Sequence, residues 1–163
     1  MSDQQFQDMA KQLLENTINL TIGLNKLLEK EYGVLKSLDT SSLEQIAEEK
    51  APITTLLDQH NQEWLQLLEK KLKPLNTNNI NRFLRDYDKK NHTKLAEKWQ
   101  ILQNHARKCQ RLNTINGTVI VLRNQAANQI LSILRGQTGD NSTYDTYGNH
   151  KVIHNGGHSL AKA

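Results

Sequence analysis

The chain has 163 residues, enough for one domain with a core of its own. Aromatic residues make up only 5% of it and the mean hydropathy is -0.70, a composition that favours slender helical layers over a β-sandwich or an α/β enzyme. The net charge of +4 comes from interspersed acidic and basic residues and does not demand a nucleic-acid partner.

The first predicted helix runs from about Gln4 to Ser37, and Ser2 or Asp3 can cap its start. Large apolar residues recur in it every seven positions, which predicts a stripe that faces the core of a helical bundle. The stripe consists of Phe6, Leu13, Leu20, Leu27 and Val34, and is widened by Leu14, Leu28 and Leu35.

The second predicted helix follows a tight connection near residues 37–40 and continues to about Lys73. The sequence Ser41-Ser42-Leu43-Glu44 is a capping box that would begin this helix. Pro52 interrupts the apolar face and predicts a kink just before it, because proline removes one backbone hydrogen bond and clashes with the preceding turn.

A short helix is predicted from about Asn78 to Lys90, between a turn at residues 73–77 and a break at His92 and Thr93. Its apolar residues fall on one side, so we expect it to act as a lid over one end of the bundle. These residues are Ile80, Phe83, Leu84 and Tyr87.

The last predicted helix runs from Leu95 to about Arg135, and Gly136 ends it. A bundle seam with alternating spacings of four and three is formed by Leu95, Trp99, Leu102, Ala106, Cys109, Asn113, Asn116, Ile120, Arg123, Ala127, Ile130 and Leu134. A second apolar stripe lies beside this seam past Cys109. One apolar face is enough to join a bundle, so a second face predicts a second partner. The predicted partner-binding residues are Leu112, Ile115, Val119, Leu122, Ala126, Ile130, Ile133 and Leu134.

Several polar residues fall on core-facing positions of the predicted helices, and four of them allow two interpretations. Lys50 and His60 either reach water from the edge of the bundle or have a specific role. Asn113 and Asn116 either fix the register of internal packing or, with Gly117 beside them, help a partner to dock closely.

The predicted organisation is an all-α antiparallel bundle of three long helices and one short helix over residues 1–136, followed by a flexible polar tail over residues 137–163. The tail has too few large apolar residues to offset the entropy of ordering it. The first ten residues lack the apolar core of a signal peptide, and no run approaches the roughly 18 apolar residues of a membrane span. We therefore expect a cytoplasmic protein without a membrane span.

No metal site or cofactor is predicted, because no acidic residue has a histidine three positions later and no CxxC or HExxH motif occurs. His150, His154 and His158 could share one helix face, but the nearby glycines disfavour that helix.

Two further patterns have competing interpretations. Cys109 and His105 are one turn apart, as in a thiolate–imidazole nucleophile, but a buried inert thiol fits the seam position of Cys109 better. The basic run from Lys89 to Arg111 is either a solvated helix face or a surface for RNA phosphates, and it lacks clustered aromatic residues for base stacking. We expect neither enzymatic activity nor a nucleic-acid partner.

Several motifs together resemble the FlgN-type flagellar export chaperones. Cys109, Asn113 and Asn116-Gly117, followed by the apolar run that ends at Gly136, are similar to the C-terminal region of that family. The tail sequence Tyr144-Asp145-Thr146-Tyr147-Gly148 is similar to its close, and the leucine-and-acid segments at 27–31 and 43–50 resemble its first helices. The histidine-bearing end after Gly148 departs from the family pattern.

The resemblance implies a non-enzymatic chaperone. Members of the family bind the hook–filament junction proteins FlgK and FlgL in the cytoplasm, keep their terminal helices from assembling early, and deliver them to the flagellar export apparatus. An amphipathic client helix would lie on the second apolar stripe. A related secretion chaperone with another client, such as the filament cap protein, and a helical RNA-binding regulator are the alternatives.

Overall fold

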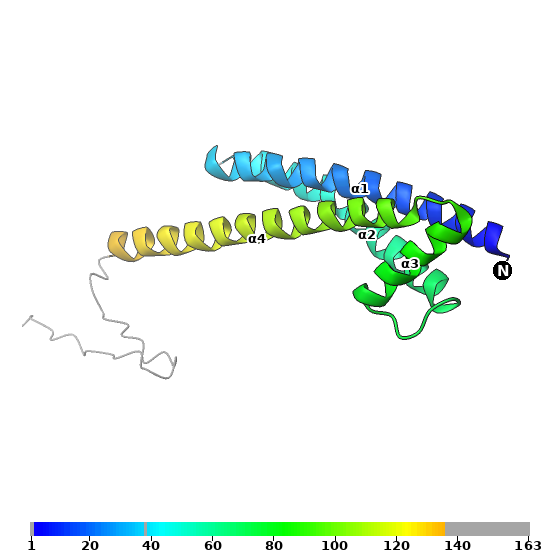
Figure 1. Ribbon diagram of the computed structural model, residues 1–163. Coiled ribbons are helices and arrows are strands. Elements are labelled where there is room, and N and C mark those ends of the chain that lie inside the picture. Colours follow the sequence, from blue (N-terminus) through cyan, green and yellow to red (C-terminus); the bar gives the residue numbers. More distant parts are fainter. Residues whose placement is uncertain (1, 38, 136–163) are drawn as a thin grey trace, which may run out of the picture. The chain divides into compact units, whose positions relative to one another are not determined.

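The computed structural model describes residues 2–37 and 39–135, and these residues form four helices and no strand. The helices are α1 (Asp3–Ser37), α2 (Thr40–Glu69), α3 (Thr77–Asn91) and α4 (Leu95–Leu134) (Figure 1). The predicted all-α class, with three long helices and one short helix, is confirmed. The chain divides into two compact units, Met1–Ile120 and Val121–Ala163, and the second is described up to residue 135. The predicted flexible tail at residues 137–163 lies outside the described residues.

The long helices of the first unit alternate in direction. An ion pair between Asp3 and Lys71 joins the start of α1 to the residues after α2, and another between Glu31 and Lys50 joins the opposite ends of the two helices. The first part of α4 runs parallel to α1, because Lys98 pairs with Glu15 early in both helices and further contacts follow in the same order (Figure 1). Successive long helices are therefore antiparallel, as predicted.

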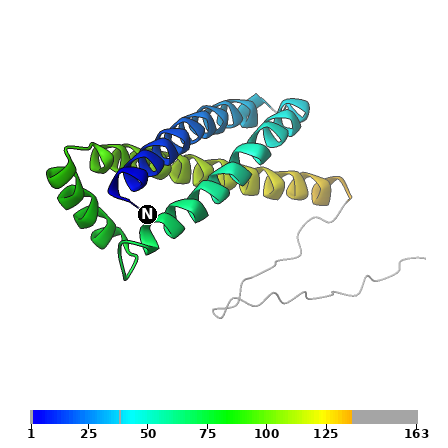
Figure 2. The ribbon, with the colours of Figure 1, turned by 90° about the vertical axis from the view of Figure 1, so that its right-hand side faces the viewer.

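The apolar core lies at one end of the first unit, where α3 crosses the ends of the long helices (Figure 2). Its buried residues come from all four helices: Phe6, Ala10, Leu14, Trp64, Leu67, Leu68, Ile80, Leu84, Tyr87 and Leu95. The rings of Trp64 and Trp99 stack with their centroids 5.5 Å apart, and those of Phe6 and Tyr87 meet edge to face at 5.1 Å. The short helix acts as the predicted lid.

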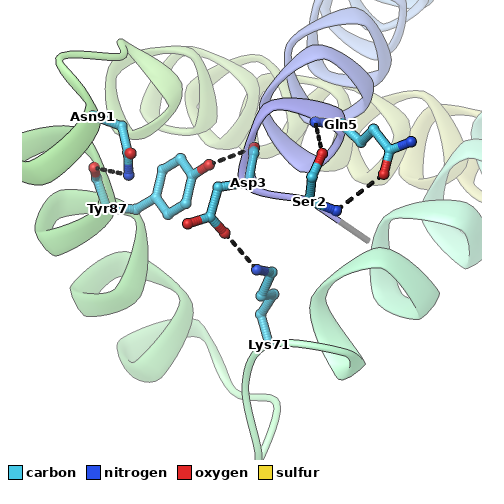
Figure 3. Close-up of polar contacts among 6 residues, drawn as sticks. All are labelled: Ser2, Asp3, Gln5, Lys71, Tyr87 and Asn91. Carbon is cyan, nitrogen blue, oxygen red and sulfur yellow. Dashed lines mark hydrogen bonds and ion pairs between the residues drawn. The ribbon is translucent and has the colours of Figure 1, made fainter.

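Polar contacts tie the first residues of α1 to this end of the bundle (Figure 3). The Tyr87 hydroxyl donates a hydrogen bond to the backbone carbonyl of Asp3, and the Lys71 ammonium lies 2.7 Å from the Asp3 carboxylate. The hydrogen bond and charge of Lys71 hold the pKa of Asp3 below its ordinary value. The Ser2 hydroxyl accepts the backbone N–H of Gln5, so Ser2 is the predicted cap.

The break between α3 and α4 falls where the sequence predicts it. His92 adopts the left-handed conformation with φ 52° and ends α3. The carboxylate of Asp88 then accepts the backbone N–H groups of Leu95 and Ala96 at 3.0 and 2.8 Å, and also the Thr93 hydroxyl. A residue of the preceding helix thus satisfies the first donors of α4, a contact that the local sequence does not reveal.

The predicted start and end of the second helix need correction. The carboxylate of Asp39, and not Ser41, accepts the backbone N–H of Ser42 and caps α2. Asp39 is as good a cap as serine, and it sits one residue before the helical segment that its side chain serves. The helix ends at Glu69, earlier than predicted, and it continues unbroken through Pro52.

The buried face of α1 is also shifted by one residue. The predicted stripe residues Leu13, Leu20, Leu27 and Val34 are only half-buried. The most buried positions are Phe6, Ala10, Leu14, Thr21, Asn25, Leu28, Glu31 and Leu35. The reason is that α1 contacts α2 on one side and α4 on the other, so the positions between these two contacts are covered from both directions.

A buried polar cluster joins the three long helices away from the apolar core. The amide of Asn116 donates hydrogen bonds to the Leu28 carbonyl at 2.9 Å and to one Glu31 carboxylate oxygen at 2.8 Å. The other Glu31 oxygen accepts the Lys50 ammonium at 2.6 Å. Asn116 therefore has the predicted internal packing role, whereas Asn113 is exposed. Lys50 has a specific structural partner and does not merely reach water.

Leu84 is fully buried on α3, so shortening its side chain should strongly lower the stability of the protein. Leu84→Ala leaves a cavity, and the free energy of unfolding should fall by about 2–5 kcal/mol in urea denaturation. Leu56→Ala, at a position 42% exposed on α2, is the matched control and should cost about 1 kcal/mol or less. Equal losses in the two variants would contradict the position of the core.

The polar cluster predicts a difference between the two neighbouring asparagines of α4. Asn116→Ala removes two hydrogen bonds from buried acceptors and should lower the free energy of unfolding by about 1–3 kcal/mol. Asn113→Ala removes an exposed side chain and should change it by only about 0.5 kcal/mol. Denaturation curves of both variants measure the difference, and an undiminished stability of Asn116→Ala would contradict the stabilising role of the buried polar cluster.

Candidate functional site

The predicted partner-binding residues all belong to α4, which is one continuous helix. In the first unit, Leu112 and Val119 are half-buried and Ile115 is 39% exposed. Their partial burial agrees with a stripe that lies beside the face in contact with α1. This part of the stripe keeps apolar surface that the described residues do not cover.

The stripe residues of the second unit are more open. Leu122 and Ile130 are each 58% exposed, Ile133 is 64% exposed and Leu134 is 76% exposed, and Ala126 is exposed as well. Fractions of this size on several large aliphatic side chains of one helix are unusual on a surface that has no partner. This part of α4 is therefore the strongest candidate for a binding surface among the described residues.

Three more exposed apolar residues belong to the same stretch of α4. Val121 is 55% exposed and Leu131 is 46% exposed, and neither lies on the predicted stripe. Ile120, assigned to the seam from its spacing, is 42% exposed. The signal that could have found them is the uninterrupted apolar run from Val119 to Leu122, which puts large side chains on all sides of one turn.

Charge is nearly absent from this surface. From Leu112 to Leu134 the only charged residue is Arg123, and the other polar residues are Asn, Gln, Thr and Ser. A solvated helix face normally carries many charged side chains, which also keep apolar surfaces apart. The sequence of this stretch therefore resembles that of a protein interface more than that of a helix surrounded by water.

The predicted seam of α4 consists of two lines of residues, each spaced by seven. Only the first of these lines is buried or half-buried throughout the first unit. Leu95, Leu102, Cys109 and Asn116, spaced by seven, are buried or half-buried. Of the alternating positions, Trp99 is half-buried, but Ala106, Asn113, Ile120, Ala127 and Leu134 are exposed. The first line continues past Asn116 with Arg123, which is half-buried, and Ile130, which is exposed. Contacts past Leu102 go to α1: Asn25 donates to the His105 carbonyl at 3.2 Å, and Lys108 pairs with Glu29 at 2.7 Å.

An open cleft lies beside the second line, and Asn113 forms part of its wall. It has a volume of about 310 Å³ and lies between α1, α2 and α4. Its walls are formed by Leu24, Leu28, Lys50, Thr54, Cys109, Gln110 and Asn113. In a closed three-helix bundle, side chains of α2 and α4 would fill this space and bury the second line.

The surroundings of Cys109 do not suit a nucleophile. Its thiol donates a hydrogen bond to the Thr21 carbonyl at 3.6 Å, and burial raises its pKa, which disfavours the thiolate. The His105 ring nitrogen Nδ1 lies 3.4 Å from the Asn25 amide. Both side chains are thus directed to α1, as expected for an inert thiol in a helix interface.

The basic run is partly neutralised by its neighbours. Lys98 lies 2.9 Å from the Glu15 carboxylate and Lys108 lies 2.7 Å from that of Glu29. Lys89 has Asp86 on its own helix at 4.0 Å. Carboxylates so close to the lysines weaken the attraction of this flank for phosphate groups.

The described residues offer neither a metal site nor a membrane span. Within residues 2–37 and 39–135, no three His, Cys, Asp or Glu side chains gather so as to hold a metal ion. His150, His154 and His158 lie outside the described residues. None of the described helices contains an 18-residue stretch apolar enough to cross a membrane.

Comparison with curated proteins and with solved structures found no match to this chain. The sequence model of one family, described as FlgN protein, matches residues 1–151, which is most of the chain. This match confirms the resemblance inferred from the motifs on α4 and in the first two helices. The chain belongs to the FlgN family and is a chaperone of flagellar export.

Proposed function

We propose that this chaperone binds the amphipathic terminal helices of the hook–filament junction proteins FlgK and FlgL in the cytoplasm. While bound, those helices cannot assemble early, and the complex delivers them to the flagellar export apparatus. The client helix lies against Leu112, Ile115, Val119, Leu122, Ala126, Ile130, Ile133 and Leu134 of α4. The chemistry is burial of apolar surface, and no covalent bond is made or broken.

The observation that carries this proposal is the open apolar surface of α4. Leu122, Ile130 and Leu134 are each more than half exposed, and the stretch around them carries one charge. An amphipathic helix in a groove uses apolar anchors at spacings of three and four residues, and the stripe residues from Leu112 to Ile133 recur at the same spacings. Covering each large anchor contributes roughly 1–3 kcal/mol, part of which offsets the ordering of the client.

The fold supports binding because α4 is ordered before the client arrives. Its first turns are capped by Asp88 and packed into the apolar core, and Asn116 is fixed on α1 and Glu31. A surface that is already helical loses little entropy on binding, so most of the ordering cost falls on the client. Such an arrangement suits a chaperone that must hold a flexible segment.

Two aspartates on the stripe should abolish client binding. Val119→Asp with Leu122→Asp places two carboxylates against the apolar face of the client, where they would be buried without partners. Titration calorimetry against the terminal helices of FlgK and FlgL should detect binding to the parent protein and none to this variant. Circular dichroism should show that the variant stays helical.

The matched control for this experiment is Asn124→Asp with Asn128→Asp, which adds the same two charges to exposed positions on the side of α4 opposite the stripe. It should bind as the parent does. Binding that survives the changes at Val119 and Leu122 would mean that the surface is misplaced. Binding of the filament cap protein in place of FlgK and FlgL would assign another client. Binding of RNA with a steep salt dependence would favour the RNA-binding alternative.

Cys109→Ser separates a chaperone from a thiol enzyme. The half-buried thiol makes one weak hydrogen bond, so this change should leave the affinity for client helices within about twofold of the parent value. The same calorimetric titration measures it. A complete loss of function in a protein that is still folded would point instead to chemistry at the sulfur.

A further inference from the structure

One charged side chain lies within the apolar side of the helical segment Val121–Leu134. At about 3.6 residues per turn, Arg123 falls on the same side as the nearest apolar residues that follow it. These residues are Ala126, Ala127, Ile130 and Leu134. The polar residues Asn124, Asn128 and Ser132 fall on the other side. A partner that covers the apolar side must therefore also cover Arg123.

Arg123 has no counter-charge among the described residues. It is half-buried, and it forms no hydrogen bond or ion pair with any of residues 2–37 and 39–135. On the C-terminal side of Arg123, the nearest residues of the same face are Ala126 and Ala127, both exposed. No large side chain of this face therefore directly follows Arg123.

We infer that the helix bound on this face carries a carboxylate that pairs with Arg123. This inference rests on the proposed function and specifies the chemistry of the client: an amphipathic helix with Asp or Glu within or beside its apolar face. An apolar client alone would remove water from a guanidinium and give it nothing in return, which is strongly unfavourable. A carboxylate matches the guanidinium with two parallel hydrogen bonds.

Charge also distinguishes this partner from a second copy of the chain. From Leu95 to Leu134 the only acidic residue is Glu97, which lies seven turns before Arg123 on the helix. Two copies paired through Val121–Leu134 would bring Arg123 against a surface without any carboxylate. The segment is therefore suited to a foreign acidic helix and unsuited to its own copy.

The test uses synthetic amphipathic helical peptides with a leucine-rich face. The peptides are identical except for one position within that face, which is Glu, Gln or Lys, and the substitution is made at each of three successive turns so that no register is assumed. Each is titrated into the full chain. At the best position, the Glu peptide should bind about tenfold more tightly than the Gln peptide, and the Lys peptide should bind most weakly.

A charge reversal identifies the residue responsible. Arg123→Glu should invert the order, so that the Lys peptide binds most tightly. Arg135→Glu changes the net charge equally, but residue 135 lies on the polar side with Asn124 and Asn128, so this control should keep the original order. An inversion in both variants would indicate general attraction between opposite charges and would overturn the specific pairing.

The remaining outcomes separate this inference from the proposed function. If the Glu, Gln and Lys peptides bind equally while the FlgK or FlgL helices bind, the pairing is wrong and the chaperone function stands. If neither peptides nor client helices bind, both are wrong. A dimer in sedimentation that dissociates with Leu122→Asp would make a second copy the occupant and would also overturn the pairing.

Discussion

The carboxylate of Glu31 joins the three long helices of the first unit away from their apolar core. It is buried, and its two oxygens are occupied by Lys50 from α2 and Asn116 from α4. A buried charge is tolerated only when it is paired and hydrogen-bonded, so this contact holds in only one relative placement of the helices. The apolar core at the other end has no such directional demand, since apolar contacts tolerate small rotations.

The same contact decides which side of α4 is left open in the first unit. With Asn116 directed at α1, the line of residues spaced by seven faces inward, and Ile115 lies to one side of it. The cleft between α1, α2 and α4 shows that the bundle does not close around this part of α4. A helix held along one narrow line by polar contacts, with apolar residues beside it, is suited to receive another helix without being displaced.

The two halves of α4 differ in their charged residues. Lysines of its first half are paired with glutamates of α1, which fixes the helix to its own fold. In the second half charge almost disappears, and Arg123 is the exception. Electrostatic pairs at an interface discriminate between partners more than they add affinity. Affinity for a client would therefore come from the aliphatic residues, and selectivity from the single arginine.

Much of the fold followed from local patterns. Four helices were predicted from the seven-residue repeats in the long helices and from the break at His92. The lid was predicted because the apolar residues from Ile80 to Tyr87 fall on one side of their helix. Boundaries were less secure: Asp39 and Ser41 are both good caps, and only the structure distinguishes them. The role of Asp88 at the start of α4 joins two helices and has no local signature.

The same distinction between local pattern and tertiary structure applies to the candidate site. The sequence alone determined that α4 carries more apolar surface than one packing face needs, because periodicity is a property of the helix itself. Only the tertiary structure decided that Asn116 points inward and Asn113 outward, that the second seam line stays open, and that α1 buries Leu14 and Leu28 more than Leu13 and Leu27. The physical reason is that burial depends on how many neighbours reach a residue and from which directions, and a helical repeat specifies a stripe without specifying what covers it.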